Sequence, residues 1–281
     1  MEETVEAVEG SKEAEAHFSN SSVTTFLKCP RMYYLKYIKG YESKRKSVNL
    51  IFGDAVHKIC KHLYKGEIDA AQSIVINYPN FPDEDIRNRG KLAKVLTEYQ
   101  RLKFPVPWDK TLAVEDKIEF RCGPYLFVVI PDAVVEWNGG IYGVEHKTMT
   151  ALRDNFFRSF GRDTQIDAQM LGIKDKYGRC DGIYVNAIVC RKGGPTSKKS
   201  EVEFLMDLVT RTDADLEKSR EYFKTHIDDL TDMVKADKED GWTWHENRTS
   251  CFDYNDSCIF CGLCNDRIDN PDKYYGRRDA H

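Results

Sequence analysis

The stretch VIPDAVVEWNGGIYGVEHKT, residues 129–148, decides how we interpret this sequence. Its centre, W-N-G-G, is typical of a β-hairpin with a two-residue type I′ turn, because Asn and Gly tolerate the positive φ angles that this turn requires. If that Asn-Gly pair forms the turn, counting outward along both strands places Asp132 directly opposite Glu145. Lys147 follows two residues later and projects from the same face as Glu145, because side chains alternate along a strand.

Asp132 and Glu145 would repel each other there, because directly opposed side chains stand about 5 Å apart at Cβ. Solvent exposure, protonation of one acid or a shared cation would each relieve the repulsion. The apolar neighbours FVVIPDAVV and IYGV predict buried strands and argue against exposure. A hard divalent cation such as Mg²⁺ answers the repulsion best. A lysine beside it would position or deprotonate an attacking water, which predicts metal-assisted phosphodiester hydrolysis. Taken alone, a short D…E-x-K pattern is more often a solvated strand end.

Length and composition indicate an ordinary globular protein with one large domain. The chain has 281 residues, of which 41% are hydrophobic and 12% aromatic, enough to bury a substantial core. Its 42 basic and 46 acidic residues give a formal charge of −4, which neither requires nor excludes nucleic acid. The first 18 residues hold six glutamates and one lysine, so we expect residues 1–17 to form an acidic disordered tail.

The sequence shows no signal peptide and no apolar run near the roughly 20 residues of a membrane span. We therefore expect a soluble, cytoplasmic protein without membrane contact. Nine cysteines are many for such a chain, and a reducing cytosol disfavours disulfides between them. Metal binding is the usual alternative for cysteines that crowd together.

Hydrophobic periodicity predicts helices, then an antiparallel set of strands, a helix, two strands and a long helix. Residues 66–110, whose packing the sequence does not define, are interpreted as a helical insertion. Two short helices are expected within residues 19–41, and further helices cover residues 49–66, 163–178 and 213–238; the expected strands cover residues 112–120, 125–137, 141–148, 182–190 and 201–209.

Taken together, these features resemble the PD-(D/E)XK nuclease superfamily, in particular the RecB-like branch with AddB and the CRISPR-associated and phage iron-sulfur exonucleases. Pro131-Asp132 and Glu145-His146-Lys147 look like its signature. The resemblance implies an α/β, restriction-endonuclease-like core, a mixed central sheet flanked by helices, over residues 18–240. It also implies a bacterial or phage-infected host cell and Mg²⁺ or Mn²⁺ as the catalytic metal.

Three further site residues follow from the resemblance. The segment FGDAVHKI looks like the glycine-histidine motif of the branch, which implies that His57 binds the metal. The main-chain carbonyl of His146 would also face the metal. Gln169, in DAQMLGI, looks like the glutamine that helps orient the site, although the tyrosine that usually follows has no clear counterpart. Taken singly, His57 fits a structural histidine and Gln169 an ordinary polar helix residue.

The C-terminal stretch CFDYNDSCIFCGLC concentrates four cysteines, Cys251, Cys258, Cys261 and Cys264. These four could form a self-contained tetrahedral zinc site. Alternatively, Cys29 joins Cys251, Cys258 and Cys264 around a four-iron, four-sulfur cluster, and Cys261 is a bystander.

The resemblance favours the cluster, because iron-sulfur members of the branch pair one early cysteine, often in C-P-x-x-Y, with three near the C-terminus. The segment CPRMYY supplies Cys29. Cys251 lies further upstream of Cys258 than the branch usually has it, so Cys261 is its rival as a ligand. Residues 241–281 would then form a Cys-rich segment that closes an iron-sulfur site with Cys29 and joins the two ends of the domain.

Basic and aromatic residues alternate in RMYYLKYIKGYESKRK, and RKGGPTSKK adds a second basic loop. Such segments suit a groove that follows phosphates and stacks the bases of a single strand, although the tyrosines could equally pack inward. Our leading hypothesis is a metal-dependent DNA exonuclease that acts on single strands or ends. The alternative is an iron-sulfur or zinc DNA-binding adaptor that holds a strand for a helicase, recombinase or integration-complex partner.

Overall fold

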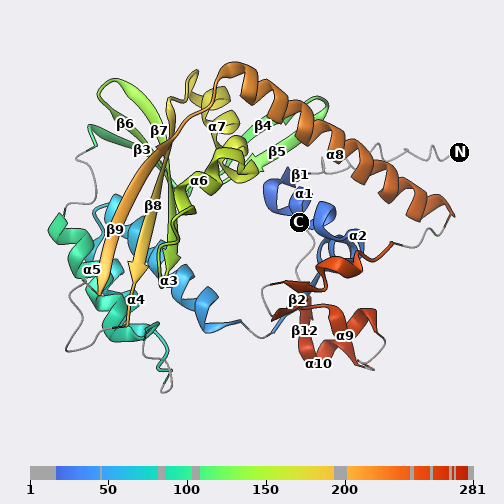
Figure 1. Ribbon diagram of the computed structural model, residues 1–281, viewed down its shortest axis with the longest axis horizontal. Helices are drawn as coiled ribbons and strands as arrows, with labels where there is room; N and C mark the ends of the chain where they lie inside the picture. Colours follow the sequence, from blue (N-terminus) through green and yellow to red (C-terminus); the bar gives the residue numbers. More distant parts are fainter. Residues whose placement is uncertain are drawn as a thin grey trace, which may run out of the picture.

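A computed structural model describes residues 17–44, 46–81, 86–102, 108–192, 201–240, 244–253, 256–265, 268 and 270–277. Two regions stand apart in Figure 1: a sheet with its covering helices, and a smaller C-terminal segment beside the first helices of the chain. The expected tail lies outside the described residues except for His17, and so does the basic loop from residue 193 to 200. Among the described helices, none is long and apolar enough to cross a membrane.

The main sheet has five strands in the order β3-β6-β7-β8-β9. All neighbours are antiparallel except β7 and β8, which run parallel, so the sheet is mixed, as the resemblance implied. The long strand β8 is buried at every position, as expected for a central strand covered on both faces. Its strands are β3 (Lys110–Val114), β6 (Ala133–Trp137), β7 (Gly140–Met149), β8 (Gly182–Cys190) and β9 (Val202–Val209).

A second sheet combines β1 (His17–Ser19), β5 (Tyr125–Val129) and β4 (Ile118–Cys122). The sequence pattern predicts single strands over residues 112–120 and 125–137, and both predictions are wrong. Each divides into two strands that belong to different sheets, so β3 and β6 pair in the main sheet while β4 and β5 pair in the second.

Local backbone chemistry explains the two divisions. Glu115 has a φ of 50°, which ends β3, and Pro131 has no amide hydrogen with which to continue β5. The Glu115 amide donates to the Asp132 main-chain carbonyl at 3.1 Å. This hydrogen bond links the two places where the chain passes from one sheet to the other. Asp132 therefore lies at the corner where the sheets diverge.

The predicted hairpin register is confirmed. Asn138 and Gly139 have φ angles of 48° and 73°, as a type I′ turn requires, and Trp137 pairs with Gly140. The pairing continues without a bulge to Ala133 and Val144. Asp132 and Glu145 are the next residues outward on the two strands.

Helices cover both faces of the main sheet (Figure 1). On one face, α7 (Thr164–Tyr177) packs between the sheets, and α8 (Asp213–Asp240) packs on α7, on α1 (Asn20–Lys28) and on β4 of the second sheet. On the other face lie α3 (Val48–Tyr64), α4 (Ile68–Asn77) and α5 (Arg89–Leu102), the last two within the predicted helical insertion. Strand β8 contributes alternate residues to the two cores, Ile183 and Val185 to the first, Ile188 and Cys190 to the second.

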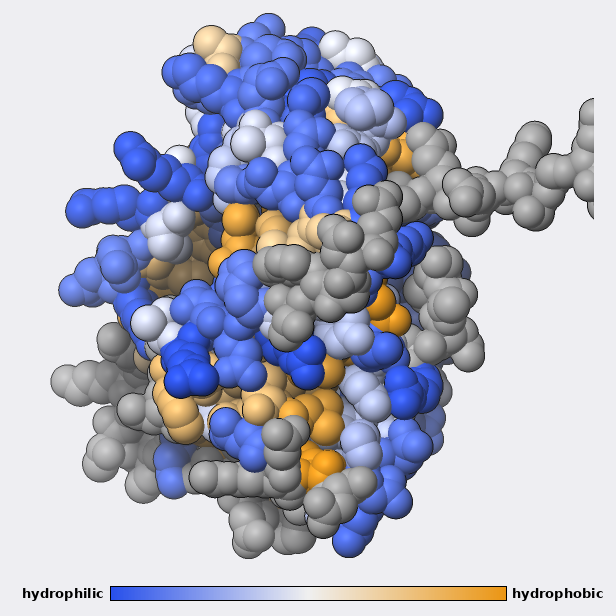
Figure 2. All heavy atoms as spheres, turned by 90° about the vertical axis from the view of Figure 1, so that its right-hand side faces the viewer, coloured by the Kyte–Doolittle hydropathy of each residue, from blue (hydrophilic) through white to orange (hydrophobic). Residues whose placement is uncertain are grey.

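The N-terminal helices are α1 (Asn20–Lys28), α2 (Pro30–Tyr33) and the π-helix η1 (Tyr34–Ile38). The C-terminal segment packs against them through a small apolar cluster around Leu35, Phe260 and Tyr275. Figure 2 shows this side of the molecule, where apolar patches lie among hydrophilic side chains. The short elements of the C-terminal segment are η3 (Arg248–Ser250), β10 (Phe252–Asp253), β11 (Asp256–Ser257), α9 (Cys261–Cys264), α10 (Pro271–Tyr274) and β12 (Tyr275–Arg277). Strand β12 pairs with β2 (Tyr41–Ser43), which follows η1.

Candidate active site

Asp132 is held by contacts from two elements. Its Oδ2 accepts a hydrogen bond from the His146 amide on β7 at 2.7 Å, and its Oδ1 lies 2.9 Å from His57 Nδ1 on α3. Because an ionised carboxylate only accepts, Nδ1 of His57 carries the hydrogen. The structure therefore brings the predicted metal residues Asp132 and His57 together.

The glycine of the FGDAVHKI segment faces β7. A Cβ at Gly53 would stand 3.4 Å from Thr148 Oγ1, which is ordinary van der Waals contact, so α3 lies close to the strand that carries Glu145 and Lys147. His57 follows one helical turn later and reaches Asp132.

Glu145 is almost fully buried, with 3% of its surface exposed, and three side chains donate hydrogen bonds to it. Lys147 Nζ donates to Oε1 at 2.6 Å. Gln165 Nε2 also donates to Oε1, at 2.9 Å, and Gln169 Nε2 donates to Oε2 at 2.7 Å. Oε1 of the Gln165 side chain accepts a hydrogen bond from Lys147 Nζ at 3.0 Å, so this side-chain amide contacts both Glu145 and Lys147.

Gln165 is the site residue that sequence reasoning missed. It precedes Gln169 by four positions on α7, so the two amides lie on one face of the helix. That spacing is visible in QIDAQ, but only the approach of α7 to β7 shows that both side chains reach Glu145.

The charges at the site oppose one another in the way the hairpin predicted. Burial raises the pKa of Glu145, and the negative charge of Asp132 raises it further, against the effect of Lys147. Burial alone would raise the pKa of Asp132, but the hydrogen bond from His57 and the nearby His146 outweigh it, so the net shift is downward. The same contact with Asp132 outweighs burial at His57 and raises its pKa. Asp132 is therefore the acid that ionises more readily, and Glu145 is the acid whose ionisation costs more free energy.

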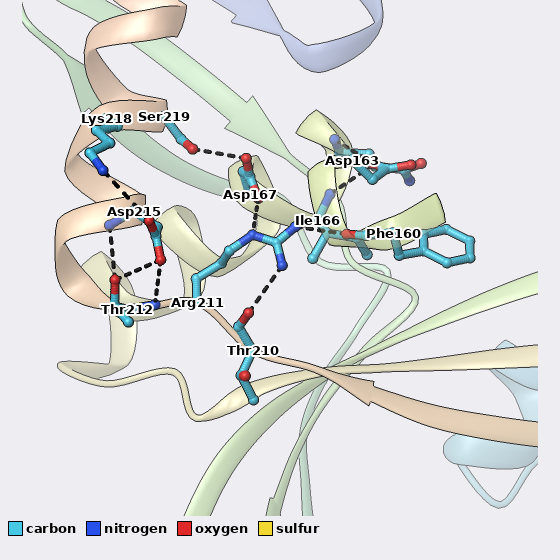
Figure 3. Close-up of polar contacts among 11 residues, drawn as sticks. Phe160, Asp163, Ile166, Asp167, Thr210, Arg211, Thr212, Asp215, Lys218 and Ser219 are labelled. Carbon is cyan, nitrogen blue, oxygen red and sulfur yellow. Dashed lines mark hydrogen bonds and ion pairs between the residues drawn. The ribbon is translucent and has the colours of Figure 1, made fainter. Parts of the chain in front are cut away.

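A buried ion pair holds α7 in place (Figure 3). Arg211 Nε donates to Asp167 Oδ1 at 2.7 Å, and its Nη2 donates to the Phe160 carbonyl at 2.7 Å. Ser219 of α8 donates to the other Asp167 oxygen at 2.8 Å. The network joins α7 to α8 and to the short helices α6 (Phe156–Ser159) and η2 (Phe160–Arg162). It positions the helix face that carries Gln165 and Gln169.

His146 points to the opposite face of β7. Its Nδ1 accepts from the buried Asn186 side chain at 2.9 Å, and the rings of Tyr64 and Tyr99 lie about 6 Å away, at 6.0 and 6.2 Å. Burial lowers the pKa of His146 to about 4, so the imidazole is neutral. Its contact with the site is through the main chain, whose amide binds Asp132. A role of its carbonyl toward a metal stays a prediction.

The donor set fits a hard divalent cation. Among the described residues, no three His, Cys, Asp or Glu side chains are already closed around one point. However, Asp132 and the buried Glu145 present opposed carboxylate charge that a cation would compensate, and His57 lies beside them. These three side chains are those that would hold it.

The structure brings Cys29 to the C-terminal cysteines. Cys29 is the N-cap of α2, and its Sγ accepts the Asn247 amide at 3.4 Å. Cys251 and Cys258 interact electrostatically with Cys29 and Cys261, and Cys264 interacts with Cys29 and Cys258.

Burial raises the pKa of Cys251, Cys258 and Cys264, and the neighbouring thiols raise it further. The pKa of Cys264 reaches about 11. Without a cation they are neutral thiols, and a bound metal would stabilise their thiolates. Among the described residues no three of these thiols are gathered as a metal site, so a bound metal or cluster stays a prediction, and Cys261 remains the rival of Cys251.

The predicted single-strand surface of RMYYLKYIKGY is partly core. Tyr33 is buried, and the rings of Tyr33 and Tyr34 stack against Trp244 at 5.9 and 5.5 Å. For these two tyrosines the inward-packing alternative is correct. Lys36 and Lys39 lie over the rings of Tyr37 and Tyr34 at the surface.

Comparisons with known proteins agree with this geometry. The family model described as the PD-(D/E)XK nuclease superfamily matches residues 17–265. No protein of curated function matches the chain. A candidate exonuclease from Eubacterium rectale superposes with a TM-score of 0.57 at 14% identity, covering 90% of this chain and 88% of that one, which shows a shared fold.

Two other solved structures match less well. The protein SSO0001 has a TM-score of 0.29 at 13% identity, with 76% of each chain covered. LHK-Exo in complex with dAMP has a TM-score of 0.32 at 12% identity, with 68% of this chain and 96% of that one covered.

Proposed function

The chain belongs to the PD-(D/E)XK nuclease superfamily, and from this premise we propose that it is a metal-dependent DNA exonuclease of the RecB-like branch. Single strands or DNA ends are its proposed substrates, and any unwinding would come from a partner such as a helicase. The observation that carries the proposal is the buried pair of Asp132 and Glu145, in which Lys147 donates a hydrogen bond to Glu145. A buried charge cluster of this kind costs stability, and function is the usual reason to retain it.

Each side chain has a separate task in the proposed reaction. Asp132, Glu145 and His57 would hold Mg²⁺ or Mn²⁺, which supplies charge stabilisation for the phosphoryl oxygens. Lys147 is 31% exposed, so its ammonium can reach solvent and orient the attacking water while it offsets phosphate charge. Gln165 and Gln169 keep the Glu145 carboxylate in place by donating to it, and Gln165 also accepts from Lys147.

We assign a four-iron, four-sulfur cluster to Cys29, Cys251, Cys258 and Cys264, with Cys261 as the rival of Cys251. The support is the hydrogen bond from the Asn247 amide to Cys29 Sγ, which ties Cys29 to the segment that carries the other thiols, and the resemblance to iron-sulfur members of the branch. Its role would be structural, because it would join residue 29 to the C-terminal segment across most of the chain. Zinc bound by the same thiols is the alternative. Iron, zinc and sulfide analysis of anaerobically purified protein distinguishes the two.

The nuclease proposal is tested with single-stranded DNA labelled at the 5′ or 3′ end, in Mg²⁺ or Mn²⁺. Wild-type protein should shorten the strand from one end, and Asp132→Ala should lose this activity. Asp69→Ala replaces an exposed aspartate on α4 and serves as the matched control, with activity like that of wild type. Equal degradation by wild type and Asp132→Ala would mean a contaminating nuclease, and a DNA-binding adaptor would then be the better description.

A further inference from the structure

A cavity of about 450 Å³ lies beside the candidate active site. Gln165 and Gln169 form one wall, so the cavity is separated from Glu145 only by the two amides that bind this carboxylate. The first turn of α1 forms the opposite side, and the end of β5 with Ile130 completes the lining. Its volume lies within the range of roughly 300–1,000 Å³ that is typical of small-ligand sites.

The chemistry of the lining is neutral. Of the described residues that line this cavity, none carries a charge: its polar groups are amides and hydroxyls, including Asn20, Ser21 and Thr24. A second, smaller cavity of about 180 Å³ beside Thr148 differs, because Arg87 is among its lining residues. Anionic phosphates are bound most strongly by cationic side chains, which the described lining does not supply, so this cavity suits a neutral group better than a phosphate.

An acceptor without a partner narrows the choice of ligand. Gln169 is 2% exposed, and its Oε1 has no hydrogen-bond partner among the described residues. Because Nε2 is bound to the Glu145 carboxylate, which only accepts, the amide cannot be flipped, and Oε1 must remain the acceptor. Asn20 Oδ1 is a second buried oxygen without a partner in the described part of the chain. Nucleobase amines and sugar hydroxyls are donors, whereas a phosphate diester offers none.

Ile130 supplies the apolar surface that a base requires. Its side chain is 57% exposed, although it lies two residues before Asp132. Consecutive Cα atoms are about 3.8 Å apart, so the Cα atoms of Ile130 and Asp132 are separated by at most about 7.6 Å. A group that rests on Ile130 is therefore close to one nucleotide away from a phosphodiester at the carboxylates.

We propose that this cavity binds the nucleoside adjacent to the cleaved phosphodiester, with its base against Ile130 and its donor groups toward Gln169 and α1. The inference rests on the proposed nuclease function and adds a substrate requirement. The bound base must be unpaired and unstacked, because the cavity holds one neutral group against an apolar side chain. Specificity for single strands or frayed ends follows from this requirement.

The test uses single-stranded oligonucleotides that contain one abasic residue at different distances from the labelled end. Wild-type digestion should slow about ten-fold at the step that brings the abasic residue into the cavity, as expected for loss of one base contact. Ile130→Ala should slow digestion of normal DNA to a similar degree and should remove the abasic pause. Ile76→Ala, which truncates a 67% exposed isoleucine on α4, should keep the pause.

A wild-type protein without a pause, or a pause that Ile130→Ala leaves unchanged, overturns the inference. A protein that cleaves no DNA contradicts the proposed function instead. In that case, fluorescence anisotropy in EDTA decides about the cavity, with a normal and a fully abasic oligonucleotide as probes. Removal of the bases should weaken binding by wild type and Ile76→Ala more than binding by Ile130→Ala, and an equal loss in all three proteins contradicts the subsite.

Discussion

The sheet region and the C-terminal segment are stabilised in different ways. Around β7 and β8, two extensive apolar clusters cover opposite faces of the sheet, and they include long helices on each side. Among the described residues, the corresponding cluster at the C-terminal segment has three buried members, Phe260 and Tyr275 of the segment and Leu35 of η1. Other large apolar residues of the segment include Phe252, which is 71% exposed, and Ile259, which is 52% exposed.

This difference explains where each region keeps its reactive groups. The sheet region has enough buried apolar surface to tolerate the destabilising contact between Asp132 and Glu145. The small C-terminal cluster cannot supply comparable stability, and small apolar cores usually need disulfides, metals or another crosslink. The thiols near Cys29 are therefore expected to stabilise structure, whereas the carboxylates reduce stability in favour of chemistry. Four predictions test this contrast.

The largest effect is expected from Lys147→Met, which removes the ammonium but keeps a long side chain. Loss of a general acid or base typically slows a reaction by about 10²- to 10⁴-fold, and we expect a loss in this range with the melting temperature nearly unchanged. Nuclease rates and thermal unfolding are measured on the same protein. Lys58→Met, an exposed lysine on α3, is the control. A large fall in melting temperature with Lys147→Met would show that the site stabilises the fold, which contradicts the view that the carboxylate site reduces stability.

The second prediction concerns Cys29→Ala and Cys258→Ala. Each should lose bound metal and open the C-terminal segment to protease, because the free energy of metal binding contributes directly to folding of a small region. Cys180→Ala, which lies outside the thiol group, should retain the metal. Metal analysis and limited proteolysis with mass spectrometry provide the measurements. Protease resistance that survives loss of the metal would contradict the assigned stabilising role.

Arg211→Leu should reduce both stability and activity. The Arg211 and Asp167 side chains are only 9% and 13% exposed, and removal of one partner from a buried pair typically costs about 3–5 kcal/mol. Denaturant unfolding measures this loss. Because α7 carries Gln165 and Gln169, kcat should fall as well.

The double variant Arg211→Leu with Asp167→Leu separates charge from position. It should recover stability relative to Arg211→Leu, because neither buried charge is left without its partner. A double variant less stable than the single one by the full cost of Asp167→Leu would show that the two residues act independently.

The smallest effect is expected at Glu201, which joins β9 to α5. Its carboxylate accepts from Lys91 and Lys94, each at 2.6 Å, and these hydrogen bonds lower its pKa from 4.5 to about 2. A lowered carboxyl pKa stabilises the folded state above the unfolded pKa, and this contribution disappears as pH falls through the folded pKa. Wild type should thus melt above Glu201→Gln at pH 6, and the gap should narrow below about pH 4.5. A gap independent of pH would exclude the ion pair as its cause.

Local patterns were sufficient where a single element carries the information. The Asn-Gly turn determined the hairpin register, and with it the opposition of Asp132 and Glu145, because strand pairing counts outward from the turn. Helical periodicity located α3, α7 and α8, because the apolar pattern of a helix is contained in its own residues. Gln165 was missed because QIDAQ contains two equivalent amides, and nothing within one helix shows which of them reaches a neighbouring strand.

The sequence by itself determined the family signature, the order of helices and strands, and the register of the catalytic hairpin, since each depends on neighbours in the chain. Only the tertiary structure decided that residues 112–137 alternate between two sheets and that both glutamines bind Glu145. These features arise from contacts between distant segments. Their free energy comes from burial and packing of whole surfaces, which no local pattern specifies.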